Sequence, residues 1–314
     1  MNAEGLDQLL AACSRFGSSN KARFQKLKVV LAQFHHQGID CILLKGADLI
    51  PRLYGVLGVR PMADVDLLVH ETDLPTIDRI LKGLSYRPEI DGNPAYRDDD
   101  DELALDLITR VWYLDDPDVI WQRAVQRDLE GVPVKAMGTN DLLIFLTAYA
   151  VAHRGCLSGS FAQDITLLVQ KEAVDWEFIV DEACRRHLKI PLHHGLAYIV
   201  TRHDRVPIPD HVLRSLAPSS LAEKFYRFLF QKLVTDKPVA ELGHLLLFIT
   251  QPGRKKWQWL RAALFPSDAF LFYRYGDRWN THPLLTRLSR PFSLLFQAVR
   301  LFTRIVRLQI TGHV

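Results

Sequence analysis

Cys41-Ile-Leu-Leu-Lys-Gly-Ala-Asp-Leu-Ile50 begins as an apolar run, reaches Lys45-Gly46 and continues with a helical pattern. This order predicts a strand, a tight turn and a helix. Gly46 lets a ligand approach the backbone closely, and the start of a helix offers unpaired N–H groups and a partial positive charge. Lys45 adds a full positive charge, so we expect a phosphate-binding turn at residues 45–46.

A second strand is predicted for Asp64-Val-Asp-Leu-Leu-Val69. Side chains alternate between the two faces of a strand, so Asp64 and Asp66 share one face while Val65 and Leu67 share the other. Their Cα atoms then lie about 6–7 Å apart, and both carboxylates can reach one or two hard cations. Two like charges side by side on an apolar strand are costly without such compensation.

Lys45-Gly46, Arg60 and Asp64-x-Asp66 together resemble the signature of an uncharacterised nucleotidyltransferase family within the DNA polymerase beta-type superfamily. The resemblance implies an α+β fold, in which a small mixed sheet flanked by helices precedes a mostly helical second domain. It also implies that the glycine turn holds a triphosphate. Arg60 has two open interpretations: contact with the substrate, or bracing of the aspartates.

The resemblance further implies a third carboxylate on the strand next to the Asp-x-Asp strand, and this acid maps onto Asp106 in the apolar run 103–112. Three carboxylates hold two Mg²⁺ ions for in-line nucleotidyl transfer in that superfamily. Many relatives carry His two residues after the third acid, where this chain has Ile108. The alternative for Asp106 is an ion pair with Arg110.

The second half of the chain is predicted to be helical, with domains at 1–137, 138–264 and 265–314. The resemblance places a His at the end of the first long helix and an Asp at the start of a Leu-rich helix, which are His153 and Asp164 here. These two residues either line the base or acceptor side of a cleft between the halves, or form an interhelical hydrogen bond.

The remaining stretches of the chain have weaker secondary-structure patterns. Helices are expected at 3–14, 21–37, 71–84 and 119–127, a short strand at 86–90, and a short strand or an extended link at 131–137. The stretch 91–102 contains the run Asp98 to Asp101. Consecutive residues cannot share one face of a strand, so we expect a solvated loop there instead of a metal site.

Charge is unevenly distributed along a chain whose formal net charge is +3. Residues 251–314 hold eleven Lys or Arg against Asp268 and Asp277. Within them, 291–310 forms an amphipathic pattern with Arg300, Arg304 and Arg307 on one face and Phe302, Ile305 and Val306 towards another. Such a helix docks on its own domain, pairs with another chain, or lies on anionic lipid.

The four cysteines lack Cys-x-x-Cys spacing, which favours reduced thiols over a zinc site or a disulfide framework. The first residues lack a basic start followed by an apolar core, and no apolar run reaches the roughly 18 residues of a membrane span. We therefore expect a cytoplasmic protein.

These features predict a Mg²⁺-dependent nucleotidyltransferase that moves a nucleoside monophosphate from a nucleoside triphosphate, expected to be ATP, to a hydroxyl or phosphate of a small-molecule or peptide acceptor. Asp64, Asp66 and Asp106 would hold two metal ions, and Lys45 with Gly46 would bind the leaving pyrophosphate. Nucleic acid is not the expected partner, because clustered aromatic stacking residues are lacking. Three alternatives stay open: an inactive nucleotide-binding protein, a toxin–antitoxin component acting on protein or transfer RNA, and a peripheral membrane adaptor that uses residues 291–310.

Overall fold

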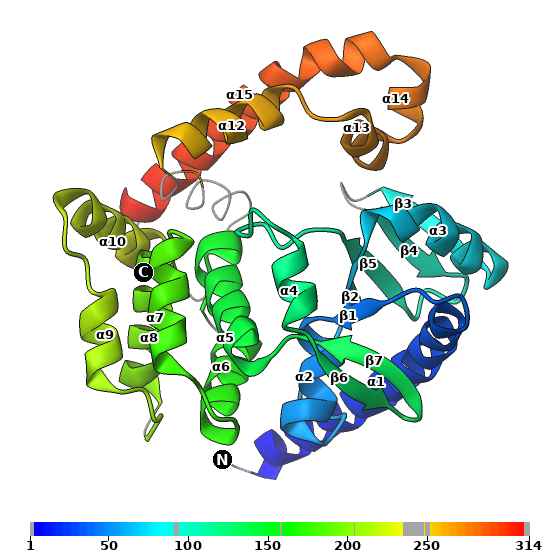
Figure 1. Ribbon diagram of the computed structural model, residues 1–314, viewed down its shortest axis with the longest axis horizontal. Coiled ribbons are helices and arrows are strands. Elements are labelled where there is room, and N and C mark those ends of the chain that lie inside the picture. The colour runs from blue at the N-terminus through cyan, green and yellow to red at the C-terminus, as the bar shows by residue number, and fades with distance from the viewer. Residues whose placement is uncertain are drawn as a thin grey trace. The chain divides into compact units, whose positions relative to one another are not determined.

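The computed structural model describes residues 3–90, 94–157, 159–203, 205–234, 248 and 252–310. The chain divides into two compact units, one formed by residues 1–138 with 272–276 and the other by residues 139–271 with 277–314. The strands all belong to the first unit, and the second is built from helices (Figure 1).

The first unit is organised around one mixed sheet with the strand order β3-β4-β5-β2-β1-β7-β6. The strands are β1 (Cys41–Leu43), β2 (Asp64–Val69), β3 (Tyr86–Ile90), β4 (Pro94–Asp98), β5 (Ala104–Ile108), β6 (Val125–Leu129) and β7 (Val132–Ala136). Two neighbouring pairs are parallel, β2 with β5 and β1 with β7, and the other pairs are antiparallel. The sheet and the helical second unit confirm the predicted α+β class.

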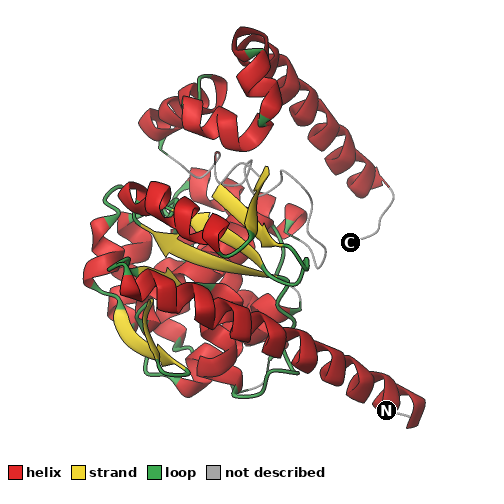
Figure 2. Ribbon diagram, turned by 90° about the vertical axis from the view of Figure 1, so that its right-hand side faces the viewer, coloured by secondary structure: helices red, strands yellow, loops and turns green. Residues whose placement is uncertain are grey.

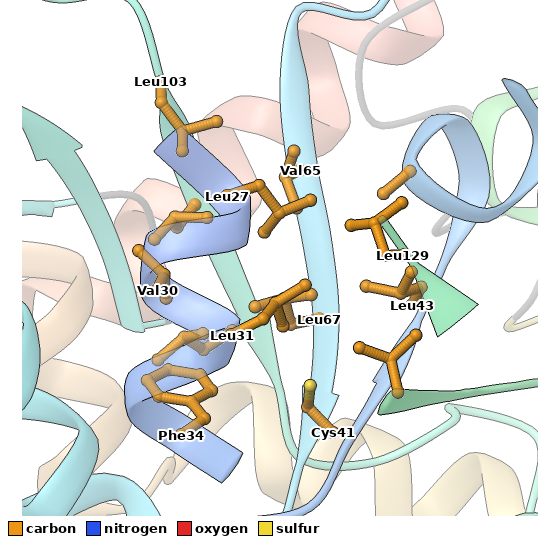
Figure 3. Packing of buried hydrophobic residues seen from close by; sticks show 14 of the residues in the cluster. Leu27, Val30, Leu31, Phe34, Cys41, Leu43, Val65, Leu67, Leu103 and Leu129 are labelled. Atoms are coloured by element: carbon orange, nitrogen blue, oxygen red, sulfur yellow. The ribbon is translucent and has the colours of Figure 1, made fainter. Parts of the chain in front are cut away.

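One face of this sheet is covered by helix α1 (Ala3–His36) and by α3 (Leu74–Gly83). Leu27, Val30, Leu31 and Phe34 recur at helical spacing along α1 and pack against Val65 and Leu67 of β2 and their neighbours (Figure 3). Each of these side chains is almost fully buried, and burying one stabilises the fold by about 1.5–3 kcal/mol. The apolar faces of the central strands are therefore turned towards α1.

Helix α1 runs without interruption, whereas two separate helices were expected. Asn20 lies at the expected break, and its amide donates hydrogen bonds to the carbonyl oxygens of Leu57 at 2.7 Å and Arg60 at 2.8 Å. Because the Asn20 side chain bonds the distant loop before β2, it does not compete with the helix backbone. The first turns of α1 extend past the sheet towards the N-terminus (Figure 2).

Three local expectations differ from the structure. Asp98 ends strand β4 and is buried, where a solvated loop was expected, because Lys26 of α1 forms an ion pair with its carboxylate. The expected helix at 119–127 ends at Gln122, as α4 (Asp118–Gln122), and the following residues form β6. Expected helix 71–84 is a 3₁₀ turn (Glu71–Asp73) followed by α3.

The second unit consists of helices, and capping residues begin two of them. They are α5 (Thr139–Ala148), a π-helical continuation (Tyr149–Arg154), α6 (Ser160–Lys171), α7 (Trp176–Arg185), α8 (Lys189–Arg202), α9 (Asp210–Leu216), α10 (Leu221–Leu233), α12 (Gly253–Leu264), α13 (Asp268–Tyr275, shared with the first unit), α14 (Asp277–Thr281) and α15 (Pro283–Ile310). Asp175 caps α7 by accepting a hydrogen bond from the Phe178 N–H, and Ser220 with Glu223 forms a capping box on α10. In the described part of the chain, no helix has the length and apolar character to cross a membrane.

Candidate active site

Three carboxylates share one face of the central sheet. The parallel pairing of β2 and β5 sets Asp66 directly beside Asp106, and Asp64 beside Ala104. Residues in register on neighbouring strands point to the same side, so all three acids lie on the face opposite the α1 core. Asp64 is exposed, Asp106 is partly exposed and Asp66 is buried.

Lys45 lies next to the buried acid of this group. It is the first residue of α2 (Lys45–Leu49), its φ of 46° places it in the left-handed region, and its Nζ is 2.7 Å from Asp66 Oδ1. Burial raises the pKa of Asp66, and the nearby Lys45 ammonium acts in the opposite direction. Asp64 raises this pKa further and Arg60 lowers it. The Asp66 carboxyl is therefore removed from water and lies beside the Lys45 ammonium.

Gly46 is needed for close packing within the chain. A Cβ atom on Gly46 would come within 2.8 Å of Arg60 Nη1 and 2.9 Å of Met62 Cγ. Arg60 is itself buried, and Asn20 holds its carbonyl oxygen. Two side chains from the loop before β2, Arg60 and Met62, thus fill the space in front of Gly46. The positive charge of Arg60 also lowers the pKa of Asp66.

A groove of about 770 Å³ opens beside Asp64 and Asp106, on the β5, β4 and β3 side. Its lining contains Asp64 and Asp106 together with Arg87, Glu89 and Arg97. Strand pairing aligns Ala104 with Arg97, and Arg97 with Arg87, so these residues form a row across three strands. Ala104 is small and leaves the floor of the groove open, and the volume falls within the range of small-molecule sites.

The basic residues of the groove were missed in the sequence because Arg97 lies next to the aspartate run 98–101, in a stretch expected to be a solvated loop. Arg97 Nε is 2.7 Å from Glu89 Oε1, and Arg87 forms an ion pair with Asp101. The available signal was the alternation along β3 and β4, which turns Arg87, Glu89 and Arg97 to one face. Arg110, the alternative partner of Asp106, forms an ion pair with Glu71 at 3.3 Å.

Carboxylate oxygens are the donors that Mg²⁺ prefers, and Asp64, Asp66 and Asp106 supply such oxygens on one face. Burial raises the pKa of Asp66, and the Lys45 ammonium 2.7 Å from its carboxyl lowers it, as a bound cation at the same position would. As they stand, no three His, Cys, Asp or Glu side chains within the described ranges are grouped to hold a metal ion. The donor set therefore fits Mg²⁺ in its chemistry, while its three side chains are not gathered around one point in this structure.

His153 and Asp164 both belong to the second unit. Asp164 is fully buried in α6, and His153 lies in the π-helical segment with its ring stacked on Tyr149 at 4.9 Å between centroids. His153 is partly buried. An acceptor-side role for either residue remains a prediction.

The parallel strands β2 and β5 carry three acids on one face, Lys45 lies in the turn after β1, and a groove opens beside Asp64 and Asp106. The chain belongs to a family described as uncharacterised nucleotidyltransferases, whose model matches residues 1–202. This confirms the resemblance found in the sequence, and the protein is a transferase that acts in nucleotidyl transfer.

Three solved structures align with this chain at low sequence identity. An antigenic nucleotidyltransferase-like protein from Paracoccidioides brasiliensis aligns with 16% identity and a TM-score of 0.45, covering 62% of this chain and 94% of that one. The lincosamide antibiotic adenylyltransferase LnuA, solved with lincomycin, aligns with 16% identity and a TM-score of 0.34 over 46% of this chain and 94% of its own. The antibiotic-resistance factor ANT(2'')-Ia aligns with 14% identity and a TM-score of 0.33 over 77% and 96%. No curated protein sequence matches the chain.

Proposed function

We propose that this protein transfers a nucleoside monophosphate from a nucleoside triphosphate, with ATP as the expected donor, to a hydroxyl or phosphate of a small-molecule or peptide acceptor, in a Mg²⁺-dependent reaction. The observation that carries the proposal is the register between Asp66 and Asp106, with Asp64 two residues away on the same face. Three acids in a mostly apolar sheet are costly to fold and need a functional reason.

The chain's own residues have distinct tasks in this proposal. Asp64, Asp66 and Asp106 would hold Mg²⁺, which when bound neutralises phosphate charge and lowers the pKa of an acceptor hydroxyl. Lys45 opposes the increase that burial causes in the pKa of Asp66, and it adds positive charge where the triphosphate would bind. Arg60 and Met62 fix the backbone at Gly46, so that Lys45 starts from a rigid turn.

The position of the groove suggests which substrate lies on which side of the acids. Lys45 follows β1, on one side of β2, while the groove extends over β5, β4 and β3 on the other side. A triphosphate near Lys45 leaves the groove free for the acceptor. Ala104 would form its floor, and Arg97 and Glu89 would supply polar contacts.

The decisive experiment incubates the protein with each nucleoside triphosphate labelled at the α-phosphate, Mg²⁺ and a crude cell extract as the acceptor pool. We expect pyrophosphate release and label in the small-molecule or peptide fraction. Asp64→Asn and Asp66→Asn should lower the rate about a hundredfold or more, since each removes charge needed in the transition state. Asp99→Asn is the control, because Asp99 is an exposed aspartate outside the groove lining and should change nothing.

Other outcomes separate the alternatives. Equal pyrophosphate release by wild type and both variants would refute the assignment of the acids. Nucleotide binding without release in any extract would indicate an inactive nucleotide-binding protein, and label in transfer RNA or in intact protein would indicate a toxin–antitoxin activity. Arg97→Ala should increase the amount of extract needed for half-maximal labelling while leaving the nucleotide requirement unchanged.

A further inference from the structure

Helix α15 exposes a continuous apolar stripe. The residues recur every three or four positions, which places them on one face of the helix. Each of the following is at least half exposed: Leu284, Leu285, Leu288, Phe292, Leu295, Phe296 and Val299. From 284 to 299 the stripe is about 24 Å long, and an exposed apolar surface of this size marks an interaction site.

The opposite side of α15 rests on neighbouring helices of the same unit. Thr286 is fully buried, and Arg290 Nε donates a hydrogen bond to the carbonyl oxygen of Ala263 in α12 at 2.6 Å. The Arg290 guanidinium also lies 4.8 Å from the centre of the Phe270 ring. Arg287 forms an ion pair with Asp268 and lies over the ring of Trp279. These contacts orient the helix so that its apolar stripe faces outwards.

The polar residues around the stripe are of one charge. Helix α15 contains five arginines and no Asp or Glu, and residues 252–310 hold eleven basic residues against two acidic ones. Arg300 lies 5.7 Å above the ring of Phe296, at the border of the stripe. The side chains of Phe302, Arg304, Ile305, Val306 and Arg307, which were part of the predicted amphipathic pattern, lie outside the described residues.

We propose that α15 is a peripheral membrane-binding helix, which lies flat on an anionic lipid surface with its apolar stripe among the acyl chains and Arg300, at the border of the stripe, at the phosphate level. A helix with Leu and Phe on one face and Arg on the other has this character. A second copy of this chain is a poorer partner, because a two-fold symmetric contact would bring arginines together without acidic residues on α15 to pair with them. This surface is separate from the nucleotidyl-transfer site, and it follows the end of the family match at residue 202.

The test is flotation of the full-length protein with phosphatidylcholine vesicles, with or without about one-third phosphatidylglycerol. We expect wild type to float with the anionic vesicles about tenfold more efficiently than with the neutral ones, and less at high salt. Phe292→Ser/Phe296→Ser should reduce this binding about tenfold. The matched control is Phe225→Ser/Phe228→Ser on α10, which removes two similarly exposed phenylalanines and should leave binding unchanged.

Circular dichroism and pyrophosphate release report whether each variant is folded and active, so loss of lipid binding alone is informative. The proposal is overturned when wild type stays with the soluble fraction in the presence of anionic vesicles, or when the α15 and α10 variants bind equally. It is also overturned when gel filtration shows a dimer that Phe292→Ser/Phe296→Ser dissociates, because the stripe is then an interface between two copies.

Discussion

Replacing Lys45 with Met tests whether the cation at the candidate active site is required to hold Asp66 in its buried, ionised state. The variant removes an ammonium 2.7 Å from a carboxylate, and the two side chains are only 18% and 4% exposed. Removing one partner of a buried ion pair costs about 3–5 kcal/mol because the other charge stays desolvated. Since Lys45 retains some solvent contact, we expect the lower end, about 3 kcal/mol at neutral pH.

The sign of the pH dependence follows from Asp66. Burial already raises the folded-state pKa of this carboxyl, and Lys45 opposes the increase, so Lys45→Met raises the pKa further. A carboxyl with a raised folded-state pKa costs stability as the pH rises from its unfolded pKa through its folded pKa. The stability gap between variant and wild type should therefore grow as the pH rises and close towards acid pH, where Asp66 is protonated in both.

Urea unfolding at a series of pH values measures this gap, and a surface pair provides the control. Lys82 and Asp78 lie 2.8 Å apart at 56% and 34% exposure, so Lys82→Met should cost at most about 1 kcal/mol. Adding Asp66→Asn to Lys45→Met should recover most of the lost stability, because no buried charge remains. A loss no larger than that of Lys82→Met, or one that does not vary with pH, would refute the reasoning.

Two further outcomes are expected. Asp66→Asn should lose less stability than Lys45→Met at pH 7 in thermal unfolding, because the ammonium that it leaves behind is 18% exposed while Lys45→Met leaves a carboxyl that is 4% exposed. Relative to wild type the variant should gain as the pH rises, because it removes a carboxyl whose pKa is raised by burial; a loss as large as that of Lys45→Met would contradict this. Gly46→Ala should lose about 1–3 kcal/mol in urea unfolding, because its Cβ would collide with Arg60 and Met62. Gly83→Ala is the matched helical control: its Cβ would meet no atom within 4 Å, so it should be neutral or slightly stabilising, and equal effects at the two glycines would contradict the packing explanation.

The central part of the first unit was predictable because its apolar residues recur with the periods of a strand and a helix. Strands β2 and β3 have the bounds that alternation and apolar content predicted, and Leu27, Val30, Leu31 and Phe34 form the expected helical face. The resemblance to the family was based on Lys45-Gly46, Arg60 and the Asp-x-Asp strand, and the family model matches residues 1–202. Local pattern and tertiary structure agree in this region.

Strand β4 was missed because its stability depends on a contact that is distant in sequence. Four consecutive aspartates predict a solvated loop, but Lys26 lies 72 residues earlier and neutralises Asp98 in the folded chain. Burying Asp98 in turn lets β4 pair with both β3 and β5, which brings Arg97 to the groove. The local pattern of a single sequence does not reveal an ion pair between two residues so far apart in the chain.

Strand β6 was missed for a different reason. Val125-Gln-Arg-Asp-Leu129 is largely exposed and has no apolar face, so its period gives no strand signal. The signal that was present is the turn: Glu130 and Gly131 both have positive φ, and Leu129 pairs with Val132 across them. A two-residue turn with both φ values positive is the type I′ hairpin turn, and a glycine at its second position marks it.

Because side chains alternate between the two faces of β2 and β5, the same strands supply both the hydrophobic core and the acids of the candidate active site. Leu105 and Leu107 face the core from the same strand that presents Asp106 to the groove. A one-residue slip of β5 would turn both leucines to solvent and Asp106 into hydrocarbon, so such a slip would abolish stability and activity together. We therefore expect insertions and deletions among homologous chains to occur mainly in the connections around β3 and β4. An insertion there would change the shape of the groove while Asp66 and Asp106 stay in register.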